Sequence, residues 1–302
     1  QTHSSLAKGL KVLGISPKYY RSLPTDQDLK IDTKALKKII KKDLKKGLKP
    51  FCIVGNAGTT NAGVVDPLVK MSVIAKKYDC WFHVDGAYGA AAMLTEAGEK
   101  ALKGMEKADS LTLDPHKWWF QPMEMGCLLV RDADHLKTTF RVSAEYLDDT
   151  NSDSLTEINY YNYGVQLTRS FRAFKLYLSL KTFGIKAFKK AVQKGMEMAD
   201  YTEQLLREQK DWQIVTPSQL GILNFAFAPN GMDSDQITAA SLAISKKVKE
   251  DGYAMITTTK ISRLTVLRMC PIHPGLTKKD IRKTIKKLTQ FAKEVIEEGC
   301  FA

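Results

Sequence analysis

Apolar and polar residues follow one another along the first half of the chain in a pattern that predicts strands separated by helices. The apolar run at residues 50–55 predicts a buried strand, and residues 80–84 predict another. Between them, apolar residues recur at helical spacing after Asp66 and Pro67, an acid and a proline that are typical of a helix start. A strand, a helix and a second strand in this order favour a parallel sheet covered by helices.

The rest of this half extends the same pattern. Further helices are expected at residues 5–14, at 33–46 and over most of 90–107, and short strands at 111–113 and 128–130. Thr33 is a suitable N-cap for the helix at 33–46, because its hydroxyl can accept a hydrogen bond from a free backbone N–H. Residues 138–163 are polar and show no periodicity, which is typical of a functional or mobile loop.

The second half predicts a smaller unit of mixed helices and strands. A long helix is expected from residue 162 to 184, and the chain stays helical to about residue 207. Later strands are expected at 212–215, 221–227 and 264–269, and helices at 235–251 and 277–299. Thr277 and Asp280 form a capping-box pattern at the start of the last helix. We therefore expect a large-domain portion with its linking helix at 1–184 and a small α+β domain at 185–302.

Composition narrows the class of protein. Of the 302 residues, 44% are hydrophobic, which is enough for a sizeable core. No apolar run approaches the roughly 20 residues that span a bilayer, and no signal peptide is recognisable, so we expect no membrane partner. The five cysteines are scattered and show no metal-binding or redox spacing, which predicts reduced thiols, a cytoplasmic protein and no metal site.

The formal net charge of +13 raises the possibility of a nucleic-acid partner. Much of the excess comes from lysine pairs on the predicted helix at 33–46, namely Lys37-Lys38, Lys41-Lys42 and Lys45-Lys46. Runs of this kind are usually solvated helix faces, and the sequence contains no zinc-finger spacing and no recognised RNA-binding motif. We therefore expect no nucleic-acid partner, with a basic binding module as the alternative.

Two polar clusters follow predicted strands and carry the candidate chemistry. Asp85 ends the strand at 80–84, and His116 and Lys117 follow the strand at 111–113. Because ligands in open α/β sheets bind beyond the carboxyl ends of the strands, we expect these side chains to face one crevice. A lysine that forms a Schiff base and an acid that pairs with a pyridinium nitrogen suit pyridoxal phosphate (PLP). Taken singly, Lys117 would be interpreted as an exposed turn lysine and Asp85 as a strand-end acid.

The motifs His-Val-Asp-x-Ala-Tyr at residues 83–88 and Asp-Pro-His-Lys-Trp at 114–118 resemble the group II PLP-dependent amino-acid decarboxylases, the relatives of aromatic-L-amino-acid decarboxylase. The resemblance runs from Gln1 almost to the C-terminus. It implies the PLP-dependent transferase fold of type I (aspartate aminotransferase-like), an α/β fold with a mostly parallel sheet flanked by helices and a smaller α+β C-terminal domain. It also implies a homodimer that converts an L-amino acid, aromatic ones favoured, to the amine and CO2. A PLP-dependent aldehyde synthase or lyase, or an inactive fragment, is the alternative.

The resemblance also implies which residues hold the cofactor. Lys117 is the lysine that binds the cofactor's aldehyde, and Asp85 keeps the ring nitrogen protonated. Ala87 packs on one face of the ring and His3 stacks on the other, where His3 also positions the substrate carboxylate. Without the resemblance, His3 would be interpreted as a frayed terminal residue.

Four further residues receive roles in the same way. Thr60, in the small-residue turn at 56–63, contacts the cofactor, and His116 either contacts its phosphate or tunes the neighbouring lysine. Tyr146 protonates the α-carbon after CO2 departs, as a general acid, and its presence favours decarboxylation over the aldehyde route. Arg268 contacts the substrate or braces the domain interface, and both interpretations stay open. The alternative for Tyr146 is a surface aromatic residue in a loop.

In this family a further portion precedes the position of Gln1. The resemblance therefore implies that this chain is the C-terminal part of a longer protein, and it raises a separate N-terminal fragment of the same protein as a further partner. The missing portion would supply sheet strands, much of the phosphate-binding loop and part of the substrate pocket. This chain alone is accordingly expected to be inactive.

Overall fold

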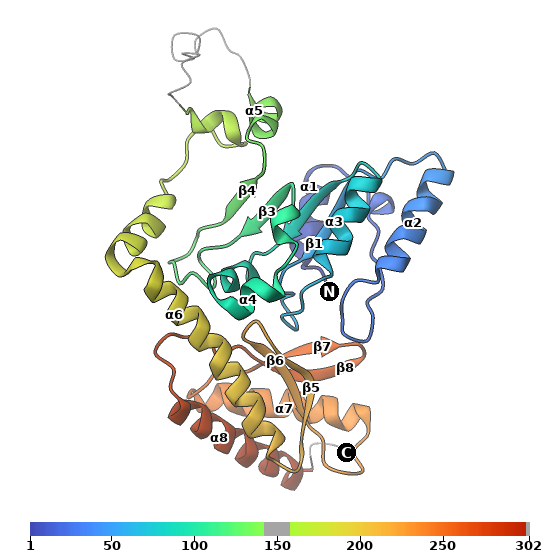
Figure 1. Ribbon diagram of the computed structural model, residues 1–302. Coiled ribbons are helices and arrows are strands. Elements are labelled where there is room, and N and C mark those ends of the chain that lie inside the picture. The colour runs from blue at the N-terminus through green and yellow to red at the C-terminus, as the bar shows by residue number, and fades with distance from the viewer. Residues whose placement is uncertain (142–157, 300–302) are drawn as a thin grey trace.

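The structure, a computed structural model, describes residues 1–141 and 158–299. Figure 1 shows two layered units, each built on one sheet, joined by one long helix. The upper unit holds the first half of the chain, and the lower unit holds the second. This arrangement positions the ends of the first sheet's strands above the second sheet.

The first sheet has the strand order β1–β2–β3–β4, with β1 Cys52–Asn56, β2 Trp81–Asp85, β3 Ser110–Leu113 and β4 Cys127–Val130. Strands β1, β2 and β3 are parallel, and β4 runs antiparallel to β3. Helix α3, Leu68–Lys77, connects β1 to β2, and its Leu68 and Met71 share a buried core with Phe82 of β2. The mostly parallel, helix-covered sheet that the sequence predicts is confirmed.

The start of α3 differs from the expectation. Its N-cap is Pro67 rather than Asp66. Asp66 is buried, and its carboxylate accepts hydrogen bonds from the backbone N–H groups of Ile31 (2.8 Å) and Asn56 (2.8 Å) and from the Asn56 side chain (2.7 Å). Because three donors from other segments use this carboxylate, Asp66 ties β1 to the chain around residue 31 instead of capping α3.

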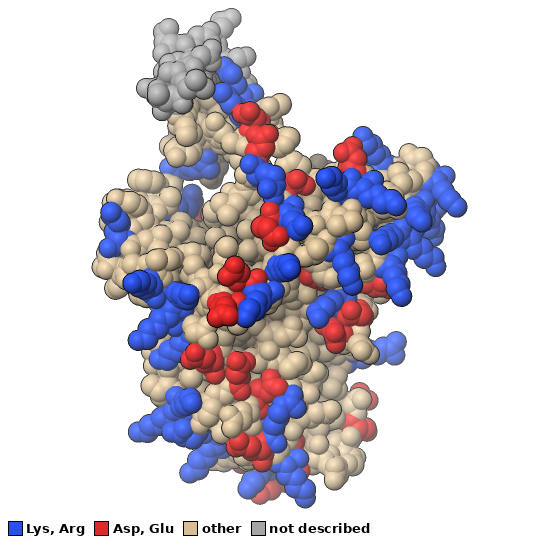
Figure 2. Space-filling model, in the orientation of Figure 1, with Lys and Arg blue, Asp and Glu red and all other residues tan. Residues whose placement is uncertain are grey.

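The other helices of the first unit are α1 Ser4–Val12, α2 Thr33–Lys45, α4 Glu96–Ala101 and α5 Asp134–Phe140. Helix α2 buries Leu36 and Ile40 on one face, and Figure 2 shows basic side chains gathered over this helix. Its N-cap is Asp32, one residue before the expected Thr33. The reason is that the Asp32 carboxylate accepts hydrogen bonds from two backbone N–H groups of the first turn.

Helix α6, Ala173–Arg207, links the two units. The predicted start at residue 162 is wrong, because Tyr160–Tyr163 form a short 3₁₀ turn and α6 begins only at Ala173. Gly184 interrupts the helix with φ 74° and ψ 155°, a conformation that glycine adopts without the steric cost of a side chain. The division of the chain into domains at residue 184 stays a prediction, and the break in α6 lies at that residue.

The second sheet is antiparallel and has the order β5–β6–β8–β7, with β5 Trp212–Gln219, β6 Ile222–Phe227, β7 Thr257–Ile261 and β8 Leu264–Met269. Helices α7, Ser234–Asp251, and α8, Lys278–Glu297, pack with α6 against this sheet around Leu223, Phe225 and Leu267. The predicted capping box of Thr277 and Asp280 is confirmed at the start of α8.

Strand β7 was not predicted. Its residues Thr257, Thr258, Thr259 and Lys260 offer little apolar surface, and none of the four is buried. It forms the edge of the second sheet and pairs along its length with β8. Its strand conformation therefore comes from this pairing and not from a hydrophobic pattern of its own.

The loop after β1 joins the two units. Asn61 O accepts a hydrogen bond from the Asn224 side chain of β6 at 3.0 Å, and Asn61 Oδ1 accepts one from Thr259 Oγ1 of β7 at 2.8 Å. Gly63, with φ +68°, approaches β5 so closely that an added Cβ would lie 2.1 Å from the Gln219 carbonyl oxygen. The carboxyl end of β1 is thereby held against the second sheet.

Candidate active site

The carboxyl ends of β2 and β3 bring the two sequence motifs together. Asp85, the last residue of β2, is paired with Thr112 across the parallel strands. Just beyond them, the Asp114 backbone N–H donates a hydrogen bond to Ala87 O at 3.1 Å. The segment that contains Asp85 is therefore held beside the segment that leads to Lys117.

Lys117 lies in the turn after β3. Its backbone N–H donates to Asp114 O at 2.9 Å, and its Nζ forms an ion pair of 2.8 Å with Asp114 Oδ2. The Lys117 side chain is 39% exposed and that of Asp114 is 17% exposed, so the amine is accessible while its partner is mostly covered. Asp114 was not among the predicted site residues, although an acid three residues before the lysine indicates an ion pair within the turn.

Asp85 keeps one carboxylate oxygen available. The residue is half-buried, and its Oδ1 accepts a hydrogen bond from the Ala87 backbone N–H at 3.1 Å. Within residues 1–141 and 158–299, no hydrogen bond engages Oδ2. A carboxylate oxygen of this kind can accept a hydrogen bond from the N–H of a pyridinium ring, the contact that a PLP site requires.

A chain of hydrogen bonds lies on the face of β2 that carries Asp85. Trp81 Nε1 donates to Ser110 Oγ at 2.8 Å, and this oxygen lies 2.7 Å from His83 Nδ1. The other ring nitrogen, His83 Nε2, is hydrogen-bonded to Thr112 Oγ1 at 3.1 Å, so each ring nitrogen has a hydroxyl partner. Burial lowers the pKa of His83, and the nearby Asp85 carboxylate opposes this shift. The imidazole therefore acts here as a neutral, oriented group.

Two glycines let the loops after β1 and β2 approach each other closely. A Cβ on Gly89 would lie 2.2 Å from the Ala57 carbonyl oxygen, and a Cβ on Gly58 would lie 2.8 Å from Gly89 Cα. Gly58 also has φ +98°, a value that residues with side chains rarely adopt. Because only glycine fits at both positions, the loop that carries Thr60 is pressed against the loop that follows Asp85.

Thr60 and Arg268 are brought together. Arg268 Nε, on β8, donates a hydrogen bond to the Thr60 carbonyl oxygen at 2.8 Å. The neighbouring Thr59 is buried, and its hydroxyl accepts from the Val64 N–H at 3.1 Å. Thr60 is exposed, and its hydroxyl has no hydrogen-bond partner in the described part of the chain. Arg268 thus braces the loop after β1, and Thr60 keeps its hydroxyl available.

His3 is exposed at the N-terminus of α1, where its Nδ1 accepts a hydrogen bond from the Ser5 N–H at 3.2 Å. It makes no hydrogen bond to the crevice at Asp85. Its neighbour Thr2 does reach this end of the sheet, because Thr2 Oγ1 accepts a hydrogen bond from Asn56 Nδ2 at 3.2 Å. Asn56 is the residue of β1 that pairs with Asp85 of β2.

The remaining candidates are placed as follows. His116 is half-buried, and its Nδ1 is hydrogen-bonded to the backbone of Met125, which fixes the ring beside the turn of Lys117. Tyr146 lies outside the described residues. Within residues 1–141 and 158–299, no group of three or more His, Cys, Asp or Glu side chains is arranged to hold a metal ion.

The chain is similar in sequence and in fold to known pyridoxal-dependent decarboxylases. The profile of the pyridoxal-dependent decarboxylase conserved domain matches residues 1–228. Aromatic-L-amino-acid decarboxylase of Bacillus atrophaeus is 43% identical over 304 residues, which cover 100% of this chain and 63% of that protein. Tyrosine decarboxylase 4 of Petroselinum crispum is 32% identical over 274 residues, covering 89% of this chain and 54% of that protein. The solved structure of Oryza sativa TDC with PLP and tryptamine is similar with a TM-score of 0.92 at 26% identity, covering 97% of this chain and 61% of that one.

Proposed function

Because the chain belongs to the family of pyridoxal-dependent decarboxylases, we propose that its protein converts an L-amino acid to the amine and CO2, with aromatic amino acids favoured. The fold is the type I fold of PLP-dependent enzymes, and PLP is the cofactor of the family. The observation that carries the proposal is the hydrogen bond from Asp114 to Ala87, which holds the segment of Asp85 beside the turn of Lys117. The chain spans 63% of the length of the Bacillus atrophaeus relative, so the proposed activity is that of the complete protein.

The residues at this crevice fit PLP. When bound, this cofactor supplies the electron sink that stabilises the charge left on the α-carbon as CO2 departs. Asp85 offers a carboxylate oxygen to the ring N–H, and such an ion pair is stronger in a covered site than in water. Lys117 offers its amine to the aldehyde carbon of the cofactor, and Asp114 positions that amine through their ion pair.

Three side chains are proposed to support the cofactor around this pair. Ala87 packs against one face of the ring and His3 against the other, while the Thr60 hydroxyl donates a hydrogen bond to the cofactor. The role proposed for Ala87 is supported by the hydrogen bond from its backbone N–H to Asp85. The role proposed for Thr60 is supported by its exposed position and its available hydroxyl, beside the turn at Gly58. Support for His3 is that its neighbour Thr2 is bonded to the end of β1, next to β2.

The remaining roles concern the cofactor's phosphate, the proton and the substrate. We assign His116 to the phosphate, because its Nδ1 is held by Met125 and its other ring nitrogen stays available in the described residues. Tyr146 is assigned as the general acid that protonates the α-carbon, a step that separates amine formation from aldehyde formation. For Arg268, the hydrogen bond to Thr60 favours bracing of the domain interface over substrate contact.

We also propose that the protein is a homodimer whose interface includes the first part of α6. Four aromatic side chains are 45% to 76% exposed there: Phe171, just before the helix, and Phe174, Tyr177 and Phe183 within it. The first three stack on one another, with centroids 5.4 Å and 6.3 Å apart. Figure 1 shows this part of α6 standing away from both sheets. An exposed apolar patch of this kind is typical of a protein–protein interface, which makes a second copy of the chain the proposed partner.

The proposal includes two further statements about the protein's setting. The portion of the relatives that this chain does not span is proposed as a further segment or a separate fragment of the same protein. A cytoplasmic location is proposed because the cysteines of the described residues are free thiols: Cys52, Cys80, Cys127 and Cys270. No helix in the described ranges is long and apolar enough to cross a membrane.

The test uses the complete protein, loaded with PLP and offered tryptophan, tyrosine, phenylalanine, DOPA and glutamate separately. We expect CO2 and the corresponding amine in equal amounts from at least one aromatic amino acid. Ammonia, hydrogen peroxide and an aldehyde in place of the amine would establish the aldehyde synthase. Bound PLP with no product from any of these amino acids would refute decarboxylation.

A further inference from the structure

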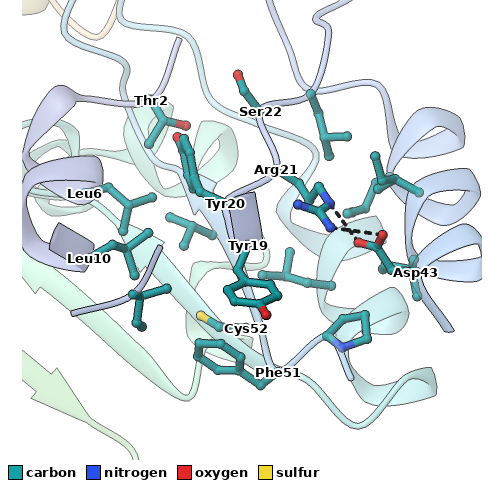
Figure 3. A pocket seen from close by; sticks show the side chains of 18 of the residues that line it. Thr2, Leu6, Leu10, Tyr19, Tyr20, Arg21, Ser22, Asp43, Phe51 and Cys52 are labelled. Atoms are coloured by element: carbon teal, nitrogen blue, oxygen red, sulfur yellow. Dashed lines mark hydrogen bonds and ion pairs between the residues drawn. The ribbon is translucent and has the colours of Figure 1, made fainter. Parts of the chain in front are cut away.

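Helix α2 has two faces of opposite character. Its inward residues Leu36, Ile40 and Asp43 are buried and line a cavity of about 820 Å³ (Figure 3), which none of the lysines within α2 lines. Leu44 is exposed, and Figure 2 shows basic side chains gathered over the helix at the edge of the molecule. The other exposed residues of α2, called here its basic face, are Lys34, Lys37, Lys38, Lys41, Lys42 and Lys45.

Four lysines of the basic face form one row along the helix. Positions i, i+4, i+7 and i+11 of an α-helix lie on one side, and Lys34, Lys38, Lys41 and Lys45 have this spacing. At about 1.5 Å per residue the row is roughly 16 Å long. This length exceeds the Debye length of about 8 Å at physiological salt. A partner that matches the row must therefore carry many negative charges spread over its surface, and not a single anionic group.

The fold supplies no counter-charge to this face. In the part of the chain that the structure describes, none of its six ammonium groups has an ion-pair, hydrogen-bond or ring partner. The two nearby acids are already engaged. Asp32 caps the first turn, and Asp43 accepts two hydrogen bonds from Arg21, at 2.9 Å and 3.1 Å, as Figure 3 shows. Because like charges at i, i+3 and i, i+4 destabilise a helix, α2 carries a repulsion that its packing does not require.

Lysines elsewhere on the molecule lie beside acids. Between α7 and α8, Lys247 Nζ lies 3.3 Å from Glu294 and 2.7 Å from Glu298, and Lys287 Nζ lies 2.6 Å from Asp251. Surfaces that only need to be solvated usually mix both signs of charge in this way. The exposed positions of α2 hold no acid, which indicates that its counter-charge comes from outside the chain.

We propose that the basic face of α2 docks on an anionic lipid surface. Clusters of about four to eight lysines on a helix are attracted to membranes that contain anionic lipids. The basic face has six lysines, and the exposed Lys46 and Lys49 follow it directly. Leu36 and Ile40 of the opposite face are buried in the core of the first unit, so α2 cannot insert an apolar face into the lipid. The protein therefore attaches by charge alone, peripherally and reversibly, with α2 parallel to the surface.

The composition of the basic face favours lipid over nucleic acid. Arginine and amide side chains bind base edges by paired hydrogen bonds, and aromatic side chains stack on bases. None of these residue types occurs among the exposed residues of α2. Lysine is a point charge on a flexible stem. Lipid headgroups diffuse within the membrane plane and can gather beneath such charges, whereas the phosphates of a duplex are fixed in position.

Sedimentation with lipid vesicles tests the proposal on the complete, PLP-loaded protein. The vesicles are phosphatidylcholine alone, or phosphatidylcholine with about 30% phosphatidylserine. We expect the protein to sediment with the phosphatidylserine vesicles at about 50 mM salt and to be released at about 500 mM, because salt screens exposed charges. It should stay in the supernatant with phosphatidylcholine alone.

Two matched sets of variants locate the binding surface. The first set lies in the row on α2: Lys34→Gln, Lys38→Gln, Lys41→Gln and Lys45→Gln. The second set removes the same charge from exposed positions of α7 and α8: Lys249→Gln, Lys279→Gln, Lys286→Gln and Lys293→Gln. The first set is expected to weaken vesicle binding at least about a hundredfold and the second less than about tenfold, since each lysine at an anionic surface contributes about fivefold.

Two features of the design separate loss of charge from loss of fold. Glutamine has nearly the helix propensity of lysine, so α2 is expected to stay folded in the first set, which circular dichroism checks. Arginine at the same four positions keeps the charge and should retain vesicle binding.

Any of three results would overturn the proposal. The first is a protein that does not sediment with phosphatidylserine vesicles at low salt. The second is equal weakening by the two sets, which would assign the binding to net charge and not to α2. The third is a DNA duplex of mixed sequence that binds more tightly than the vesicles at the same salt and loses this binding in the α2 set. Vesicle binding uses no amino-acid substrate, so its failure is distinct from failure of the proposed decarboxylation.

Discussion

The ring of Tyr88 stacks on the indole of Trp118, with centroids 4.9 Å apart and an interplanar angle of 6°. Trp118 is fully buried and packs on Gly195 of α6 and on Gly221 between β5 and β6, where an added Cβ would lie 3.3 Å and 3.2 Å from the indole. The Tyr88 hydroxyl donates a hydrogen bond to Leu220 O at 2.9 Å. The stack therefore joins both sequence motifs to the second unit, directly beside the proposed cofactor-binding lysine.

Replacing Trp118 by alanine is expected to lower the free energy of unfolding by about 3–5 kcal/mol, the range for removing a large aromatic side chain from a core. The matched variant Tyr88→Phe keeps the stack and loses the hydroxyl's hydrogen bonds to Leu220 O and Cys270 Sγ, so its expected cost is about 1–2 kcal/mol. Urea unfolding followed by circular dichroism measures both. Equal costs for the two variants would show that the stack does not hold the units together.

Borohydride reduction of the complete protein with PLP is expected to attach the reduced cofactor to Lys117 and to no other lysine. We expect this selectivity because Lys117 shares a crevice with Asp85, whose carboxylate can bind the ring N–H of the cofactor. Lys117→Ala should abolish the adduct. Lys100→Ala, which removes an exposed lysine paired with Glu96 at 2.7 Å, should retain it. Peptide mass spectrometry locates the adduct, and an adduct that persists in Lys117→Ala would contradict the proposed site.

His83 is expected to make stability depend on pH. Burial lowers its pKa below the ordinary value of 6.5, so the unfolded chain binds this proton at a higher pH than the folded chain. The stability contribution is fully present above about pH 6.5 and is lost as the pH falls through the folded pKa. His83→Gln should flatten the fall in the urea midpoint between about pH 7 and about pH 5. Parallel pH curves for His83→Gln and the parent chain would rule this out.

Gly89→Ala is expected to cost about 1–3 kcal/mol and to weaken PLP retention, because overpacking forces the backbone to shift. The new methyl group would lie 2.2 Å from the Ala57 carbonyl oxygen. Gly9→Ala is the matched control: it lies inside α1 with nothing within 4 Å of the new Cβ, and alanine there should stabilise by about 0.4–1 kcal/mol. Thermal unfolding and gel filtration of the PLP-loaded protein measure the two effects. A neutral Gly89→Ala would mean that the two loops can separate.

Much of the fold follows from short-range patterns that the sequence displays. The strands around Val54 and Val84 and the helix between them follow from the spacing of apolar residues, because burying one face of a helix or strand requires apolar residues at that element's own repeat. The capping box of Thr277 and Asp280 follows from bonds within one turn. The identities of Asp85 and Lys117 as site candidates follow from polar residues placed directly after apolar strands.

Other features depend on contacts between distant segments, which local patterns do not specify. Strand β7 forms because it pairs with β8. The Asp66 carboxylate accepts hydrogen bonds from the backbone N–H groups of Ile31 and Asn56, and so it does not cap α3. The sequence by itself determined which residue types stand at the strand ends. Only the tertiary structure decided that the Asp114 N–H bonds to Ala87 O and that Trp118 stacks on Tyr88, because these contacts depend on where the chain returns in space.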